Sequence, residues 1–167
     1  MTRIVSFAAA VLVCGLSAAA NETQGNEWRT ATTSDDGDVV MIVSGSENER
    51  GTFFSCAGDK LSVGVATEAG NIVEMLSKQT SRSNDREISL SIGDGEPHQS
   101  RWTYLPSIKI AVANDELTAK KLYNSAIKGD AVSWKMPGRQ AMDVSFPSLN
   151  ETFTSFANDC SVTKPAK

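Results

Sequence analysis

Histidine is the scarcest of the residues that catalysis and metal binding use most. The chain of 167 residues has one histidine, His98, and three cysteines, and it contains no CxxC, HExxH or His-x-His pattern. A zinc site would therefore need carboxylates to complete it, and a Ser-His-Asp or Cys-His enzyme would have a single candidate base. We expect no metal and no cofactor, and a protein that is more readily a binder than an enzyme.

Long apolar runs are confined to the beginning of the chain, MTRIVSFAAAVLVCGLSAAA. A basic Arg3, an apolar run over residues 4–16 and a final Ala-Ala-Ala are typical of a secretory signal peptide with an A-x-A cleavage site. The run is too short to span a membrane, which takes about 20 residues. Cys14 could carry a lipid, but the bulky Val13 before it favours cleavage after the alanines. We expect residues 1–20 to be removed, leaving a periplasmic or secreted protein without membrane insertion.

An excess of basic residues is also lacking. The chain has 16 Lys and Arg residues against 20 Asp and Glu, and its formal charge of −4 becomes −5 when Arg3 leaves with the signal peptide. A mildly acidic surface argues against nucleic-acid binding, which needs clustered Lys and Arg. No basic amphipathic helix is visible that would bind a membrane surface. We therefore expect a protein partner in the cell envelope.

Only two cysteines, Cys56 and Cys160, remain after the signal peptide. Two cysteines in an exported chain most often form one disulfide, because the compartment is oxidising. The pair is separated by 104 positions, and closing so long a loop is worth about 4 to 5 kcal/mol in the chain-entropy model. Two separate free thiols are the alternative.

Most of the chain from Trp28 onward has the pattern of short strands separated by turns. Residues 39–43 are continuously apolar, which is typical of a strand buried on both faces. The turn signals Asp-Gly at 36–37 and 94–95 and Pro-Gly at 137–138 predict antiparallel hairpins. Further strands, most of them with alternating apolar residues, are predicted within residues 52–57, 61–67, 87–92, 98–105, 107–113, 131–136 and 141–146.

Two helices are predicted in the second half of the chain. The first covers residues 114–129, with Asn114 or Asp115 as its cap and one apolar face made by Ala119, Leu122, Tyr123, Ala126 and Ile127. The second lies in SFPSLNETFTSFANDC, where Ser148 and Glu151 have capping-box spacing and an apolar stripe comprises Leu149, Phe153, Phe156, Ala157 and Cys160. Residues 68–87 fit either a helix or a short strand followed by a loop.

Together these elements predict an α+β fold, with a mainly antiparallel sheet or sandwich of about seven to nine short strands and two helices. The C-terminal helix is expected to pack on the sheet and to be tied to it by the disulfide. Residues 21–27 are predicted to be a flexible arm, residues 28–163 a single domain and residues 164–167 a tail. We expect the three tryptophans, at 28, 102 and 134, to pack in the core rather than to form a ligand platform.

The segment GDGEPHQSR is the candidate for ligand or partner binding. It places Asp94, Glu96, His98 and Arg101 close together in sequence. A lone histidine in a loop is usually solvated. A hydrolase or small-ligand-binding protein that uses these residues is therefore the alternative to a protein-binding role. The glycines do not match the G-x-G-x-x-G phosphate loop and are better explained by a turn.

Several residues occur in an order that resembles a known family. Trp28, Cys56, the phrase REISLSIGDGEPHQSRW, a later helix and an apolar helix ending at Cys160 resemble the periplasmic accessory proteins of type VI secretion called VasI or TagO. Residues 92–95, Ile-Gly-Asp-Gly, replace the Arg-Ile-Asp usual in those proteins. The resemblance implies an exported, non-catalytic, disulfide-closed domain that assists secretion.

The disulfide can be tested without a structure. Thiol labelling of the mature protein, denatured but not reduced, is expected to modify no cysteine, because both sulfur atoms are already bonded to each other. Labelling after reduction is the matched control and should modify both cysteines. Two labelled thiols in the unreduced sample would contradict the pairing.

Overall fold

A computed structural model describes residues 26–31, 39–80 and 82–160, which form one antiparallel sheet of nine strands with three helices. The strands are β1 (Arg29–Ala31), β2 (Val39–Val43), β3 (Thr52–Ala57), β4 (Lys60–Ala66), β5 (Asn84–Ile92), β6 (His98–Leu105), β7 (Ile110–Ala113), β8 (Val132–Lys135) and β9 (Met142–Val144). The helices are α1 (Ile72–Ser77), α2 (Glu116–Lys128) and α3 (Glu151–Asp159). The predicted α+β class is confirmed, and α1 accounts for part of the segment that fitted either a helix or a strand.

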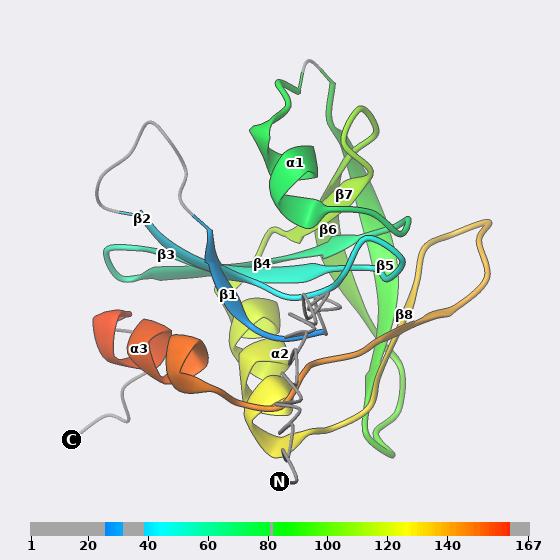
Figure 1. The fold of residues 1–167 in the computed structure, drawn as a ribbon. Helices are drawn as coiled ribbons and strands as arrows, with labels where there is room; N and C mark the ends of the chain where they lie inside the picture. The colour runs from blue at the N-terminus through cyan, green and yellow to red at the C-terminus, as the bar shows by residue number, and fades with distance from the viewer. Residues whose placement is uncertain (1–25, 32–38, 81, 161–167) are drawn as a thin grey trace, which may run out of the picture.

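The sheet combines two meanders that meet in its middle. Its strand order is β1-β2-β3-β4-β7-β6-β5-β8-β9, and β4 joins the second meander by pairing Gly64 with Val112 of β7. The β5–β6 and β8–β9 hairpins have the predicted partners. Figure 1 shows β5 and β8 running steeply across the direction of β2, β3 and β4, with α2 in the angle between the two parts.

The larger hydrophobic core lies on the face of the sheet that α2 and α3 cover. Trp28, Trp102 and Trp134 are each no more than 1 % exposed, which confirms that the tryptophans are core residues. Trp102 and Trp134 meet edge to face at 5.8 Å between ring centroids. Tyr123 of α2 stacks on Phe153 of α3 at 5.1 Å, so the two helices share one aromatic cluster.

A smaller core lies on the opposite face of the sheet, under α1. Ile72 of α1 packs there with Met41, Val43, Phe53 and Ile110, all of them buried. Strands β2 and β3 are therefore covered on both faces, as the continuous apolar run of β2 predicts. In contrast, side chains on the same outer face of β5 and β6, such as Glu87 and Arg101, are exposed.

Helix α2 begins and ends close to the predicted residues. The Asp115 carboxylate accepts a hydrogen bond from the Thr118 N–H, and Gly129 ends the helix in the left-handed conformation with φ of 70°. Ile127, which was predicted on the buried face, is 45 % exposed. The buried stripe is rotated toward Ser125, whose small side chain fits against the sheet and donates its hydroxyl proton to Lys121 O.

Helix α3 is capped by Asn150 instead of the predicted Ser148. The Asn150 Oδ1 accepts a hydrogen bond from Phe153 N at 3.1 Å, and its Nδ2 donates to Trp28 O at 2.8 Å. Because the amide carries an acceptor oxygen and a donor nitrogen, one side chain both caps α3 and holds the chain just before β1. Because the helix begins at Glu151, Leu149 lies before its first turn and is 47 % exposed rather than buried.

The disulfide joins the end of α3 to β3. Cys160 is the C-cap residue of α3, and its Cα lies 5.7 Å from that of Cys56. Both cysteines are almost fully buried. The predicted pairing is therefore confirmed, and with it the attachment of the C-terminal helix to the sheet. A buried disulfide of this kind is typical of proteins that fold in an oxidising compartment.

The two candidate caps of α3 can be distinguished by mutation. Asn150→Ala is expected to lower the free energy of unfolding by about 1 to 2 kcal/mol, because it removes the cap and leaves the Trp28 carbonyl without its donor. Ser148→Ala is the matched control and should change stability by less than about 0.5 kcal/mol. Urea unfolding measures both. A larger loss in Ser148→Ala than in Asn150→Ala would contradict the observed cap.

Candidate functional site

The four residues of the predicted binding segment lie on a turn and the strand that follows it. Asp94 and Glu96 are exposed in the turn between β5 and β6, which Gly93 opens with a φ of 55°. His98 is the first residue of β6, and Arg101 lies three residues further along the same strand. His98 therefore begins the strand predicted over residues 98–105 and is not a solvated loop residue.

Strand alternation separates His98 from Arg101. Successive side chains of a strand point to opposite faces of the sheet, and β6 buries the even-numbered Ser100 and Trp102. His98 belongs to this inner face, whereas Arg101 is on the outer face, where its Nε lies 3.6 Å from the Glu87 carboxylate. The structure does not gather the four predicted residues into one site.

The His98 imidazole is held in its neutral form by its surroundings. Its Nε2 is buried and has no hydrogen-bond partner among the described residues. Burial, and after it the nearby Lys121 ammonium, lowers the pKa of His98 below its ordinary value, while Asp115 opposes this shift. An enclosed Nε2 does not reach a substrate in solution, so this nitrogen is poorly placed for general acid or base catalysis.

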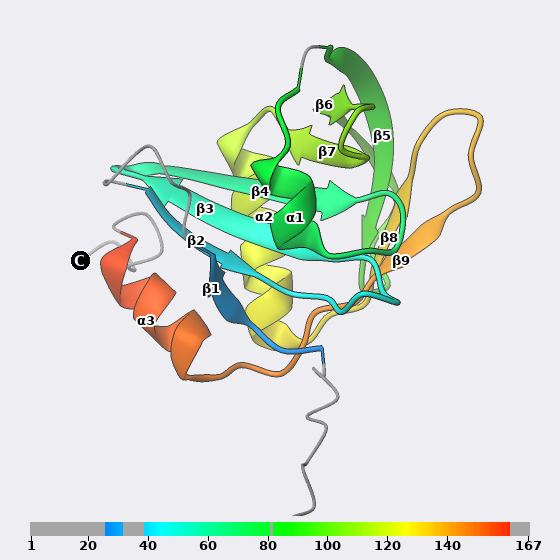
Figure 2. The same ribbon diagram turned by 45° about the horizontal axis from the view of Figure 1, so that its top comes forward.

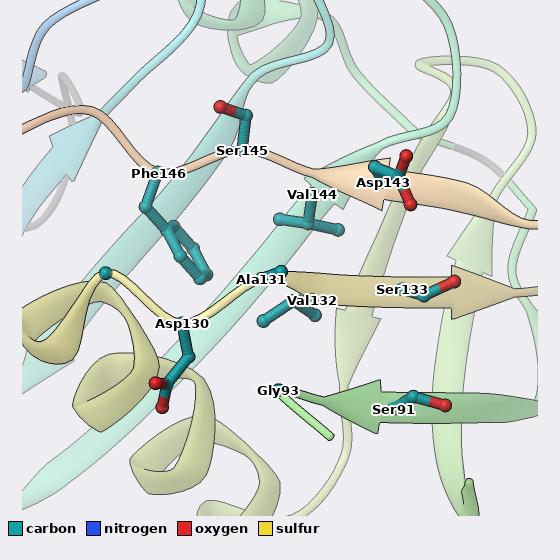
Figure 3. Close-up of a pocket in the computed structure, with 11 residues that line it drawn as sticks. Ser91, Gly93, Asp130, Ala131, Val132, Ser133, Asp143, Val144, Ser145 and Phe146 are labelled. Carbon is teal, nitrogen blue, oxygen red and sulfur yellow. The ribbon is translucent and has the colours of Figure 1, made fainter. Parts of the chain in front are cut away.

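A cavity of about 380 Å³ opens at the end of the sheet where β5, β8 and β9 lie side by side (Figure 3). Ser91, Ser133 and Asp143 form one row across the three strands, because the strand register places them opposite one another. Gly93, Gly129 and Ala131, which have small side chains or none, also line this cavity. The lining comprises Ser91, Gly93, Gly129, Asp130, Ala131, Val132, Ser133, Asp143, Val144, Ser145 and Phe146.

The cavity offers hydrogen-bond acceptors and hydroxyl groups. Its charged groups are the carboxylates of Asp130 and Asp143, and its lining contains no histidine, cysteine, lysine or arginine. It therefore has no nucleophile paired with a nitrogen base, and it suits neutral or cationic groups better than anions. The sequence pattern did not single out Asp130 or Asp143. Asp143 lies on β9, and Asp130 lies two residues before β8, so the β8–β9 hairpin brings their segments together, while β5 adds Ser91 and Gly93 to the lining.

Two further hollows lie on the outside of the molecule. One, of about 370 Å³, is lined by Asp85, Arg86, Glu87 and Arg101, so it includes one residue of the predicted binding segment. The other, of about 380 Å³, is lined by Asn26, Asn48, Glu49, Arg50, Ala69, Asp143 and Ser145. Both are lined by polar and charged side chains from the surface, in contrast to the enclosed apolar pockets that usually hold small organic ligands.

The described residues contain no cluster of three or more His, Cys, Asp or Glu side chains that could hold a metal ion. Their helices also include none that is long and apolar enough to cross a membrane. Comparison of this chain with protein-family models, with curated proteins and with solved structures finds no match. The function must therefore be argued from the geometry described above.

The environment of His98 predicts a pH dependence of stability. Because the pKa of His98 is lower in the folded than in the unfolded chain, the unfolded chain binds the proton more readily. The His98 contribution to the free energy of unfolding is therefore fully present above about pH 6.5, the unfolded pKa, and decreases as the pH falls toward the folded pKa. Urea unfolding over this range should show a smaller decrease for His98→Gln than for the unchanged protein.

Gln99→Ala is the matched control for this measurement. Gln99 follows His98 but lies on the outer face of β6 and is exposed. The variant should keep the pH dependence of the unchanged protein, since it leaves the imidazole in place. An unaltered pH dependence in His98→Gln would contradict the lowered pKa of the histidine.

Proposed function

We propose that this chain is an exported, non-enzymatic domain that acts through protein–protein contacts in the bacterial envelope, as a secretion accessory or an inhibitor-like binder. The observation that supports this proposal is the outer face of β5, β6, β8 and β9, which no helix or strand of the described residues covers. Helix α1 covers the other part of the same face, over β2 and β3. Figure 2 shows α1 in front of the sheet and away from β8 and β9.

The uncovered face is charged, polar and supported by a rigid core. Glu87, Gln99, Arg101 and Lys135 are exposed on it, and the inner face of the same strands buries Trp102 and Trp134. A surface held by a packed sheet and a disulfide loses little conformational freedom on binding, which favours affinity. This arrangement suits recognition of another folded or extended protein more than it suits covalent chemistry.

The resemblance to the VasI or TagO accessory proteins gives the proposal a more specific form. Trp28, Cys56 and Cys160, which carry part of the resemblance, all belong to the buried core and the disulfide. Their structural role supports a resemblance in the core and the disulfide of the domain, not in its surface. The partner in this form of the proposal is a periplasmic component of a secretion apparatus, and the exposed strands are the surface that meets it.

Small-ligand binding is the second candidate, and the cavity in Figure 3 is the observation that favours it. Its serines and its two carboxylates could hold a small neutral or cationic molecule by hydrogen bonds. Hydrolysis by the segment from Asp94 to His98 gains no comparable support, because His98 and Arg101 face opposite sides of the sheet and Nε2 of His98 is enclosed.

The proposal is tested with the mature, disulfide-bonded protein immobilised on a resin and exposed to envelope extract of the producing organism. We expect one partner to be enriched, identified by mass spectrometry, and to bind again as a purified protein. The variant Arg101→Glu/Lys135→Glu should weaken this binding, since it reverses charge on the uncovered face. The matched variant Lys120→Glu changes an exposed residue of α2 and should not. Absence of any protein partner, together with turnover of a small molecule, would contradict the proposal.

A further inference from the structure

The first half of β5 forms an open edge within an otherwise paired part of the sheet. β5 pairs with β6 from Asn84 to Leu90, whereas it pairs with β8 only from Ser89 to Ile92. Among the described residues, no strand pairs with the other side of residues 84–88. The cause is the chain after β8, which turns at Pro137-Gly138 and leaves the sheet, and Figure 1 shows β5 continuing beyond this point.

Two hydrogen bonds show which main-chain groups face the open side. Gly93 N donates to Ala131 O at 2.7 Å, so the main-chain groups of Gly93 face β8. The main-chain groups of every second residue before it in β5 face the same side. On the other flank, Asn114 N donates to Arg101 O, so the main-chain groups of the odd-numbered residues of β6 face away from β5. Those of the even-numbered residues face β5. The N–H and C=O groups of Asp85 and Glu87 therefore face the open side, while those of Arg86 pair with β6.

A hollow accompanies this edge. Asp85, Arg86 and Glu87, together with Arg101, line the cavity of about 370 Å³ described above. All three residues of β5 are exposed. One of the main-chain groups on the open side, the Asp85 carbonyl, accepts a hydrogen bond from the exposed Arg86 Nη1 at 3.0 Å, which an added strand would replace. Main-chain groups that no neighbouring strand pairs, beside an open hollow, are the arrangement to which an extended segment of another protein can add as a further strand.

Charge selects which strand can add. The side chains of Asp85 and Glu87 lie on the same face of β5, because they are two residues apart. Residues directly opposite each other on neighbouring strands stabilise the pair when their charges differ and destabilise it when their charges are alike. Two copies of this chain pairing antiparallel about Arg86 would place Asp85 of one copy opposite Glu87 of the other. Self-pairing is therefore disfavoured. On the β6 side, Arg101 Nε lies 3.6 Å from the Glu87 carboxylate and Thr103 Oγ1 donates to Asp85 Oδ1 at 3.2 Å. A strand with basic residues at alternate positions would approach the same carboxylates from the open side and is favoured.

We infer that the edge at Asp85–Glu87 binds an extended segment of a partner protein by strand addition, and that this segment carries Lys or Arg at alternate positions. The inference rests on the proposed protein-binding function and names its surface and the chemistry of its partner. The added strand receives hydrogen bonds from the main chain of Asp85 and Glu87, and its basic side chains lie against the two carboxylates.

The inference is tested with the mature, disulfide-bonded protein and synthetic peptides of about seven residues, the length of an ordinary strand. One peptide alternates Lys with Val, a second alternates Glu with Val, and a third repeats the Lys peptide with N-methyl groups on alternate residues. In the free protein the Asp85 and Glu87 amides should exchange with solvent quickly and the Arg86 amide slowly. The Lys peptide should slow exchange at Asp85 and Glu87 by about tenfold or more, while the other two should not.

Variants separate the hydrogen bonds from the charges. Glu87→Pro removes both an N–H of the open side and a carboxylate, whereas Glu87→Gln removes the carboxylate alone, and both spare the ladder to β6. The proline variant should abolish peptide binding while the protein still unfolds cooperatively, and the glutamine variant should only weaken binding. Asp85→Lys/Glu87→Lys should prefer the Glu peptide. Glu96→Lys changes an exposed acid on the neighbouring turn and should bind the Lys peptide as the unchanged protein does.

Three results would overturn the inference. They are slow exchange at Asp85 and Glu87 in the free protein, no peptide binding at millimolar concentration, and binding that survives either N-methylation or Glu87→Pro. The partner captured from envelope extract distinguishes protein binding in general from strand addition at β5. If that partner binds Glu87→Pro as well as it binds the unchanged protein, protein binding stands and the β5 edge is excluded as its site.

Discussion

The attachment of α3 to the beginning of β1 is the interaction on which the rest of the structure depends. Trp28 donates its indole N–H to Pro147 O at 3.3 Å, and its own carbonyl accepts from Asn150. Its ring packs 5.2 Å from Phe153. Cys160 then fastens the far end of the helix to β3. Residues more than a hundred positions apart are thereby joined at both ends of one short helix.

This closure matters because α3 is too short to be stable alone. A helix of nine residues is below the roughly 12 to 15 residues at which isolated helices become marginally stable in water. Packing of Phe153 and Phe156 against Tyr123 supplies the stability that the isolated helix lacks, and it also joins α3 to α2. The inner face of the sheet is thus used mainly for packing, whereas Glu87, Arg101 and Lys135 on the outer face are exposed.

Several features were predictable because they depend on residues close in sequence or on one simple constraint. The alternation in β5, the hairpin at Pro137-Gly138 and the cap at Asp115 are local patterns, and the structure has all three. The disulfide followed from there being two cysteines to pair. In contrast, the local capping-box spacing predicted Ser148 as the cap of α3, whereas Asn150 caps it and also donates to the carbonyl of the distant Trp28. The cavity presents the same difficulty, since Ser91 of β5 joins Ser133 and Asp143 of the β8–β9 hairpin only when β8 pairs with β5.

By itself the sequence determined the class of fold, the tryptophan core and the covalent link between β3 and the C-terminal helix, because periodicity, residue size and cysteine count act without reference to distant neighbours. Only the tertiary structure decided that Nε2 of His98 is buried, and that β5 extends beyond β8 with Asp85 and Glu87 at an open edge. Strand order and register are set by which distant segments pair, and that pairing depends on the packing of the whole chain.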